Sequence, residues 1–370
     1  MNEAAVPPKP DELEVSIFGP GRGECVVVHL GGNEWCVIDS CLGREVREPV
    51  AISYLKRLGN TDHSNIRLVV ATHWHDDHIA GLASIIALSP KAEFCCSSAI
   101  RSDEFLTLVA TAPETISGHS GVDELAAILS HLQARGDEVV PIFGIKDRTI
   151  LNLPVTGRFF PVTLTALSPS DLTFLLALKQ IASIIPKEDE PQRRIIKPTP
   201  NHASLVLSLE AGGRRALLGA DLEHTGSRGE GWTAVLNAHH APPAKIFKVP
   251  HHGSSGADYP DVWTKMLESD PIAVVTPFAL GRVKLPKTSD LERLSARTRS
   301  LYCTAQGSGK SLRRDPAVER EQKLKLSNLR VLEGQPGQVR IRWSTSDPTA
   351  LPEIKLFNGA YKVPNSTPPH

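Results

Sequence analysis

The stretch from residue 72 to residue 81 constrains this chain more than any other. It reads Thr-His-Trp-His-Asp-Asp-His-Ile-Ala-Gly and follows an apolar run, residues 66–71, that predicts a buried strand. Its ligand-type residues are His73, His75, Asp77 and His78. Imidazole nitrogens and carboxylate oxygens are donors that Zn²⁺ and neighbouring divalent transition metals accept. The spacing therefore predicts a metal-binding loop at the end of a strand.

The same loop has enough donors for two metals. His73 and His75 are two residues apart on extended backbone and point to the same side, whereas Asp77 and His78 follow at a turn and face a second position. The alternative is a loop of solvated histidines. Four ligand-type residues at this spacing, between a strand and a helix expected over residues 79–88, argue against it.

Further ligand-type residues follow other apolar runs. The strand expected over residues 34–38 leads into Asp39, and the strand over 216–219 leads into Asp221. Residues 244–250 lead into His251 and His252, and His202 precedes a hairpin over residues 205–219. Taken alone, Asp39 is equally a helix cap or a turn carboxylate, and Asp221 is more often a turn residue than a ligand.

This order of motifs resembles the metallo-β-lactamase superfamily, and Lys-Val-Pro-His-His-Gly-Ser at residues 248–254 resembles its ComEC-like branch. The resemblance spans roughly residues 13–309 and implies an αββα sandwich with metals at one edge. It also implies a role for each candidate. His73, His75 and His202 would surround one metal; Asp77, His78 and His251 would surround the other; Asp221 would bridge them; and Asp39 would support the loop through hydrogen bonds.

Two of these assignments have alternatives. His202 is either a ligand or a substrate contact, because ComEC-like proteins often have Asn-x-x-Ser at this place without the histidine. His252 is expected beside the ligands, as a proton-transfer residue, but His251 and His252 can exchange roles. The sequence also departs from the branch, since Leu285 stands where the histidine of a His-Pro pair is common.

The chain divides into a catalytic domain, residues 1–309, and a small β-rich C-terminal extension, residues 310–370. Within the first, residues 97–200 form a variable insertion without a chemistry-bearing cluster. Its charged, Pro-punctuated end, residues 187–200, is either a solvated linker or a lid that brings Arg193 and Arg194 to an anionic substrate. The extension is expected to be the docking surface for any protein partner.

Composition limits the partners and the compartment. The 370 residues contain 41 basic and 41 acidic side chains, which argues against a broad basic surface for duplex DNA. No signal peptide and no run of eighteen apolar residues is present, so no membrane association is expected. The six cysteines lack Cys-x-x-Cys spacing and are expected to be reduced, buried residues of a cytoplasmic protein.

Two divalent ions, Zn or Mn, lower the pKa of a bridging water from 15.7 toward about 7 and supply hydroxide at neutral pH. We therefore expect a hydrolase, with Asp77 and His252 as catalytic residues, and favour a phosphodiesterase or nuclease acting on nucleic acid or a nucleotide. The residues expected to contact the substrate are Ser204, Ser254, Arg193, Arg194 and Lys284. The alternatives are an ester, lactone or amide hydrolase, or a hydrolase-fold component of a multiprotein complex.

Overall fold

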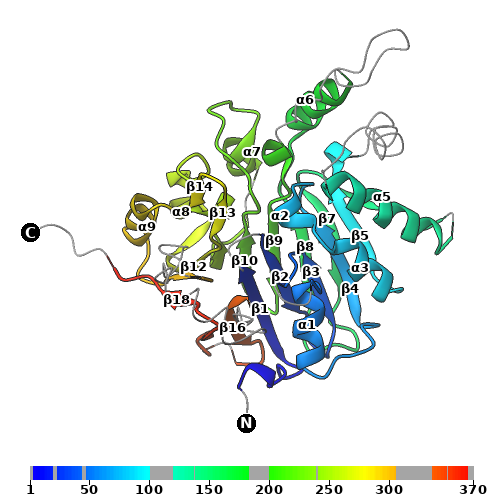
Figure 1. Cartoon of the computed structure of the whole chain (residues 1–370). Coiled ribbons are helices and arrows are strands. Elements are labelled where there is room, and N and C mark those ends of the chain that lie inside the picture. Colours follow the sequence, from blue (N-terminus) through cyan, green and yellow to red (C-terminus); the bar gives the residue numbers. More distant parts are fainter. Residues whose placement is uncertain are drawn as a thin grey trace, which may run out of the picture.

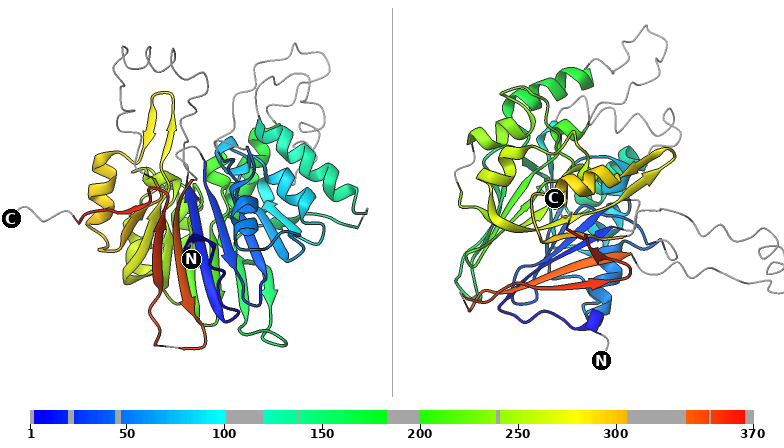
Figure 2. Two further views of the ribbon diagram at one scale, coloured as in Figure 1. Left: turned by 60° about the horizontal axis from the view of Figure 1, so that its bottom comes forward. Right: turned by 90° about the vertical axis from the view of Figure 1, so that its left-hand side faces the viewer.

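Two eight-stranded sheets pack face to face, with helices on their outer faces (Figures 1 and 2). This is the predicted αββα sandwich. The computed structural model describes residues 3–19, 23–43, 47–100, 120–136, 138–182, 200–238, 241–305, 336–347 and 349–365. Within these residues, no helix is long and apolar enough to cross a membrane.

The first sheet contains, in spatial order, β17 (Glu353–Phe357), β16 (Gly337–Ser344), β1 (Glu12–Gly19), β2 (Cys25–His29), β3 (Trp35–Ile38), β4 (Ile66–Ala71), β5 (Glu93–Ser97) and β6 (Ile142–Gly144). The second contains β18 (Tyr361–Lys362), β15 (Leu301–Cys303), β12 (Leu267–Val275), β11 (Ala244–Lys248), β10 (Arg214–Leu218), β9 (Leu207–Ala211), β8 (Val162–Ala166) and β7 (Arg148–Leu153). A separate hairpin consists of β13 (Phe278–Leu280) and β14 (Val283–Leu285).

The helices lie on the outer faces of the sheets and at their edge (Figure 1). They are α1 (Val50–Arg57), α2 (Asp76–Ile79), α3 (Leu82–Leu88), α5 (Ser120–Gln133), α6 (Asp171–Ala182), α7 (Gly231–Ala238), α8 (Pro260–Lys265) and α9 (Thr288–Ser295). Short 3₁₀ turns are η1 (Glu3–Ala5), η2 (Ser98–Ile100), η4 (Pro200–Ala203) and η5 (His251–Gly253).

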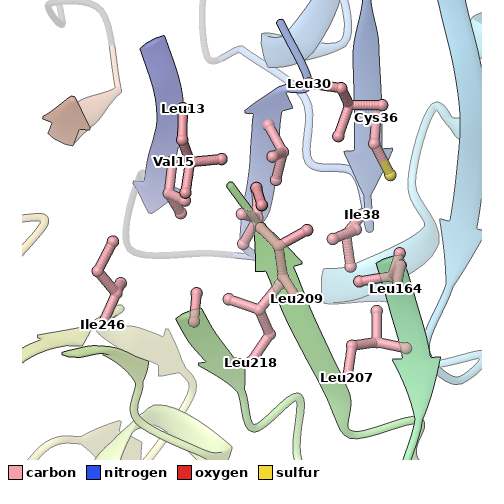
Figure 3. Packing of buried hydrophobic residues seen from close by; sticks show 14 of the residues in the cluster. Leu13, Val15, Leu30, Cys36, Ile38, Leu164, Leu207, Leu209, Leu218 and Ile246 are labelled. Atoms are coloured by element: carbon pink, nitrogen blue, oxygen red, sulfur yellow. The ribbon is translucent and has the colours of Figure 1, made fainter. Parts of the chain in front are cut away.

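Alternation along the strands builds three apolar layers. In β2, Val26 and Val28 enter the core between the sheets, whereas Cys25 and Val27 pack under the helices of the first sheet. Figure 3 shows the central layer, where side chains such as Leu13 face Leu209 from the opposite sheet. All six cysteines are buried and free of disulfides.

Parallel pairing places the candidate residues at one edge. Strands β3, β4 and β5 run parallel in the first sheet, and β10, β11, β12 and β15 do so in the second. The loops that leave the carboxyl ends of parallel strands meet at the same edge of a sheet. The loops after β3, β4, β10 and β11 therefore all reach that edge.

The helix expected over residues 79–88 is interrupted. It forms α2 and α3, separated by Gly81 in a left-handed conformation with φ of 84°. A side chain at Gly81 would be strained by this φ, and its Cβ would come 2.5 Å from Leu42 Cδ2, which would have to shift. The Glu124 carboxylate of α5 accepts hydrogen bonds from the backbone N–H groups of Gly81 and Ala83, at 2.8 and 3.0 Å. These contacts fix the end of the metal loop.

Strands near the C-terminus complete both sheets instead of forming a separate element. β16 pairs with β1 over eight residues, and β18 pairs with β15. The boundary predicted between residues 309 and 310 therefore does not separate two packing units. Residues 306–335, which include the expected strand 326–332, lie outside the described residues.

A buried charged network holds β16 against β1. Glu14 is fully buried and accepts hydrogen bonds from Tyr54 Oη at 2.6 Å, Ser16 Oγ at 2.8 Å and Arg342 Nε at 2.7 Å. Arg342 also donates to the carbonyl oxygens of Val6 and Pro7. The network thus joins the N-terminal segment, α1 and a C-terminal strand.

We expect Arg342→Met to lower the free energy of unfolding by about 3 kcal/mol, because it leaves the buried Glu14 charge without its cation. Urea denaturation measures this. Lys265→Met, which removes an exposed ion pair with Asp261, is the control and should change stability little. The double variant Glu14→Gln, Arg342→Met should lose less than the sum of the single variants. Strict additivity would contradict the interpretation of Glu14 and Arg342 as a coupled pair.

Candidate metal centre

His78 lies at the centre of the edge where the loops meet. Its ring is fully buried, and four carboxylates surround it. Nδ1 is 2.7 Å from Asp39 Oδ2 and 3.6 Å from Glu24 Oε1, and Nε2 is 3.3 Å from Asp221 Oδ1 and 3.6 Å from Asp77 Oδ2. So much buried negative charge requires cations nearby.

Two groups of donor atoms meet at Asp221. One consists of His73, His75 and Asp221. The other consists of Glu24, His78, Asp221 and His252. Within each group the donor atoms lie within 4.8 Å of one another. The structure therefore contains two adjacent potential metal positions with one carboxylate in common.

The buried histidines present the same nitrogen to the site. Nδ1 of His73 lies 3.0 Å from Thr72 Oγ1, Nδ1 of His78 lies 2.7 Å from Asp39 Oδ2, and Nδ1 of His252 lies 2.8 Å from the Thr276 carbonyl oxygen. A hydrogen bond from Nδ1 fixes the tautomer that leaves the Nε2 lone pair free for a metal. This is the arrangement expected of imidazole ligands.

Two buried atoms support the same conclusion. His78 Nε2 and Asp221 Oδ1 have no hydrogen-bond partner of good geometry among the described residues. An unpaired buried polar atom costs free energy, so such atoms usually have an ion or water as partner. A divalent cation between the imidazole nitrogen and the carboxylate oxygen would satisfy both. The donor set thus fits a metal.

Asp39 holds the metal loop, residues 72–81, in place through hydrogen bonds. It accepts hydrogen bonds from the Thr72 backbone N–H at 2.8 Å and from Thr72 Oγ1 at 2.7 Å, as well as from His78. Burial raises the pKa of Asp39, while the charge and hydrogen bond of His78 act against this rise. Asp39 therefore ties the end of β3 to the first residues of the metal loop.

The protonation states of His73 and Asp77 are those that metal ligands have. Burial, together with the neighbouring charge of His78, lowers the pKa of His73 well below its ordinary value, so this ring is neutral. Burial alone would raise the pKa of Asp77, but His78 and His252 lower it overall. Metals bind neutral imidazole and ionised carboxylate, the forms that His73 and Asp77 have here, whereas at His78 and His252 burial is outweighed by the Asp221 carboxylate and its neighbours, which raise the pKa of both rings.

Glu24 and Lys248 belong to the centre, although neither residue was predicted from the sequence to lie there. Lys248 Nζ is buried, 2.5 Å from Glu24 Oε1 and 3.9 Å from Asp221 Oδ1, and donates to the Ala220 carbonyl oxygen at 2.8 Å. Glu24 also accepts a hydrogen bond from Thr276 Oγ1 at 2.6 Å. Glu24 is therefore neutralised by an ammonium group, which makes it a weaker ligand candidate than the other donors. A lysine inside the apolar strand 244–250 was the only sequence signal for this pair.

The two adjacent histidines are placed opposite to their predicted roles. His252 turns inward, with Nε2 at 3.2 Å from Asp77 Oδ2 and 3.8 Å from Asp221 Oδ2. His251, the predicted ligand, turns away and bonds Glu223 at 2.8 Å. His202 also lies near Glu223, at 3.4 Å, and outside both donor groups. The reversal arises because residues 251 and 252 both have left-handed φ angles, of 45° and 53°, so strand alternation does not extend to them.

The predicted substrate contacts are more dispersed. Ser204 is fully buried beside η4, and Ser254 Oγ lies 3.2 Å from His251 Nδ1. Lys284 lies on the exposed face of the β13–β14 hairpin. Arg193 and Arg194 lie outside the described residues, as does the predicted lid, residues 187–200, apart from Pro200.

We expect His252→Ala to lose bound metal and His251→Ala to keep it, because only the His252 imidazole belongs to a donor group. Elemental analysis of the purified variants after dialysis with metal measures this. The two substitutions are chemically identical and adjacent, so each is a control for the other. Equal metal loss in both, or loss in His251→Ala alone, would restore the assignment predicted from the sequence.

Comparisons with known proteins give a family match and a set of similar solved structures. A family model described as the metallo-beta-lactamase superfamily matches residues 18–109. A search of curated proteins found no match. Among solved structures, the chain is similar to the metallo-beta-lactamase fold protein YhfI from Bacillus subtilis, with 12% identity over 64% of this chain and 70% of that chain and a TM-score of 0.34.

Two other solved structures are similar at the same level. Zn²⁺-bound PqqB from Methylobacterium extorquens has 15% identity over 64% of this chain and 71% of that chain, with a TM-score of 0.33. The HARLDQ-motif metallo-beta-lactamase from Cronobacter sakazakii has 16% identity over 63% of this chain and 76% of that chain, with a TM-score of 0.35. The match to the metallo-beta-lactamase superfamily model includes the whole loop 72–81.

Proposed function

We propose that this chain is a dinuclear metal-dependent hydrolase that cleaves phosphodiesters, as a phosphodiesterase or nuclease. The observation that carries the proposal is Asp221, whose carboxylate belongs to both donor groups. The likeness of residues 248–254 to the ComEC-like branch, which includes deoxyribonuclease domains, supports the choice of substrate. When bound, two divalent ions, Zn or Mn, activate a water and neutralise charge on the phosphoryl oxygens.

The residues of the chain have separate tasks in this reaction. Asp77 is the carboxylate of the cluster most open to solvent, with 18% of its side chain exposed, whereas His78 and Asp221 are buried. It is therefore placed to accept the proton of the attacking water. His252, whose Nδ1 donates to the Thr276 carbonyl oxygen, turns its Nε2 toward the site as one of the residues that would hold a metal. Asp39 and Thr72 keep the loop fixed.

The β13–β14 hairpin supports an anionic substrate. The Phe278 ring stacks on His252, with centroids 5.1 Å apart and an interplanar angle of 21°, so the hairpin begins at the metal centre. Its exposed residues include Arg282 and Lys284. In the left view of Figure 2 this yellow hairpin stands clear of the sheets. It therefore brings positive charge to the rim of the site, where a nucleic acid strand or nucleotide phosphate would lie.

The first test is metal content together with hydrolysis of bis(p-nitrophenyl) phosphate by wild type and Asp221→Ala. We expect about two metals per wild-type chain. In the variant, turnover should fall by at least about 100-fold, because a shared ligand is removed. p-Nitrophenyl acetate and a lactone are the comparison substrates. Faster turnover of these than of the phosphodiester would favour ester or lactone hydrolysis, and a metal-free, inactive wild type would favour a binding role.

The second test concerns the hairpin. We expect Arg282→Ala, Lys284→Ala to raise KM for a single-stranded oligonucleotide by about tenfold at low salt, because two exposed charges are lost. The salt dependence of KM should weaken as well. Turnover of bis(p-nitrophenyl) phosphate, which is too small to span the hairpin, should stay unchanged. Lys265→Ala on α8 is the matched control, and an equal effect there would remove the hairpin from the substrate path.

A further inference from the structure

A polar layer lies on the outer face of the first sheet, where β1 pairs with β16. Along these strands Val15, Val339 and Ile341 face the core between the sheets, so the residues that alternate with them face outward. We call this layer the arginine cluster, and it consists of Glu14, Ser16, Tyr54, Arg57, Gln338, Arg340 and Arg342. None of these residues belongs to either donor group of the metal centre.

The arginine cluster contains more positive than negative charge. It has three guanidinium groups and one carboxylate, Glu14, which is 2.7 Å from Arg342 Nε. Among the described residues no carboxylate forms an ion pair with Arg57 or with Arg340. Two positive charges are therefore left without a counter-charge. Burial of such a charge is costly, so buried guanidinium groups usually have an anion as partner.

Arg340 has free hydrogen-bond donors although it is buried. It is 1% exposed, its Nη2 donates to the Glu3 carbonyl oxygen at 3.0 Å, and its Cζ lies 4.7 Å from the centroid of the Phe357 ring. The ring offsets part of the cost of burying the charge. Arg340 Nε and Nη1 nevertheless have no hydrogen-bond partner among the described residues. These N–H groups remain available to a ligand.

Arg57 is close to Arg340. The Arg57 guanidinium lies over the Tyr54 ring, with Cζ 5.4 Å from the ring centroid. Ser16 is directly opposite Arg340 in the β1–β16 register, and its Oγ donates to Tyr54 Oη at 3.4 Å. Arg57 Nε is also buried without a hydrogen-bond partner in the described part of the chain. Burial lowers the pKa of Arg57, Tyr54 acts against this, and the charge of Arg340 lowers the pKa further. An anion beside both guanidinium groups would relieve this repulsion.

A thin segment of chain covers the arginines. The backbone carbonyl oxygens of residues 3, 6 and 7 accept hydrogen bonds from Arg340 and Arg342. The Glu3 carboxylate itself pairs with Lys355, at 3.5 Å. Every residue from 3 to 10 is half-buried or exposed, so this segment covers the arginine cluster as a single layer. A small anion therefore needs to displace only this layer to reach Arg340.

We propose that Arg57 and Arg340 bind a free phosphate ion on the outer face of the first sheet. Guanidinium groups form strong charge-assisted hydrogen bonds with phosphate oxygens. Phosphate carries up to two negative charges, which match the two guanidinium groups that lack a counter-charge, whereas a carboxylate carries one. Because Arg340 is 1% exposed, the free ion fits better than a phosphate on a larger molecule. This site is independent of the proposed phosphodiesterase function, since it needs no metal.

The test is calorimetric titration with inorganic phosphate at constant ionic strength. We expect Arg340→Met and Arg57→Met each to weaken phosphate affinity by about tenfold or more, because each removes hydrogen bonds to a charged group. Arg299→Met, which removes a guanidinium group whose side chain is 81% exposed, is the matched control and should keep the affinity. The same titrations in the Asp221→Ala background separate this site from phosphate bound at the metal centre. Glucose 6-phosphate should bind more weakly than inorganic phosphate.

A second readout locates the ion. Phosphate should slow amide hydrogen exchange in residues 3–7 and in β16 of the wild type, but not of Arg340→Met. Without phosphate, Arg340→Met should be at least as stable as the wild type, because it removes a charge without a counter-charge. If Arg340→Met does not fold, Arg57→Met decides.

Three results would overturn the proposal. The first is equal phosphate affinity in the wild type and the folded arginine variants. The second is loss of all phosphate binding in Asp221→Ala, which would leave the metal centre as the phosphate site. The third is tighter binding of glucose 6-phosphate than of inorganic phosphate, which would exclude a site for the free ion.

Discussion

The architecture of this protein depends on a concentration of buried negative charge at one edge of the sandwich. Asp39, Asp77, Asp221 and Glu24 surround His78, and Lys248 is the cation that contacts Glu24 among them. Burying carboxylates without positive partners is costly, so this edge is stable only with cations bound or with protons taken up. The parallel strands β3 and β4 in one sheet and β10 and β11 in the other bring these groups together, and the rigid core beneath keeps them in place.

The sequence predicted the features that depend on local pattern. The apolar runs before residues 72, 219 and 251 became strands β4, β10 and β11, and the cluster 72–78 and Asp221 meet at one edge. Strand periodicity and motif order were sufficient for that, because both are read along the chain. Periodicity and motif order could not decide whether His251 or His252 faces the donor groups. The left-handed backbone at both residues turns the second ring inward, and two adjacent histidines carry no signal of that turn.

Partners distant in sequence were also beyond local reasoning. Glu24 and Lys248, which are 224 residues apart in the sequence, form a buried ion pair. Each charge inside an apolar stretch indicates that a partner exists, but not which residue it is. Likewise, the sequence of β16 alternates like that of any half-buried strand, and only its register with β1 and the Arg342–Glu14 contact show that it belongs to the first sheet. A charged stretch before it suggested a separate extension, because composition does not reveal pairing.

Two charged groups near the candidate metal centre differ in exposure. On one side Lys248 and Glu24 are buried, with 1% and 2% of their side chains accessible, so they cannot exchange protons readily with solvent. On the other side His202 and Glu223 are 38% and 28% accessible. A hydrolytic reaction moves protons to and from solvent, and a substrate also needs access. The more open side of the candidate centre is therefore that of Asp77, His202 and Glu223, whereas the buried ion pair holds Asp221 and the backbone before it in place.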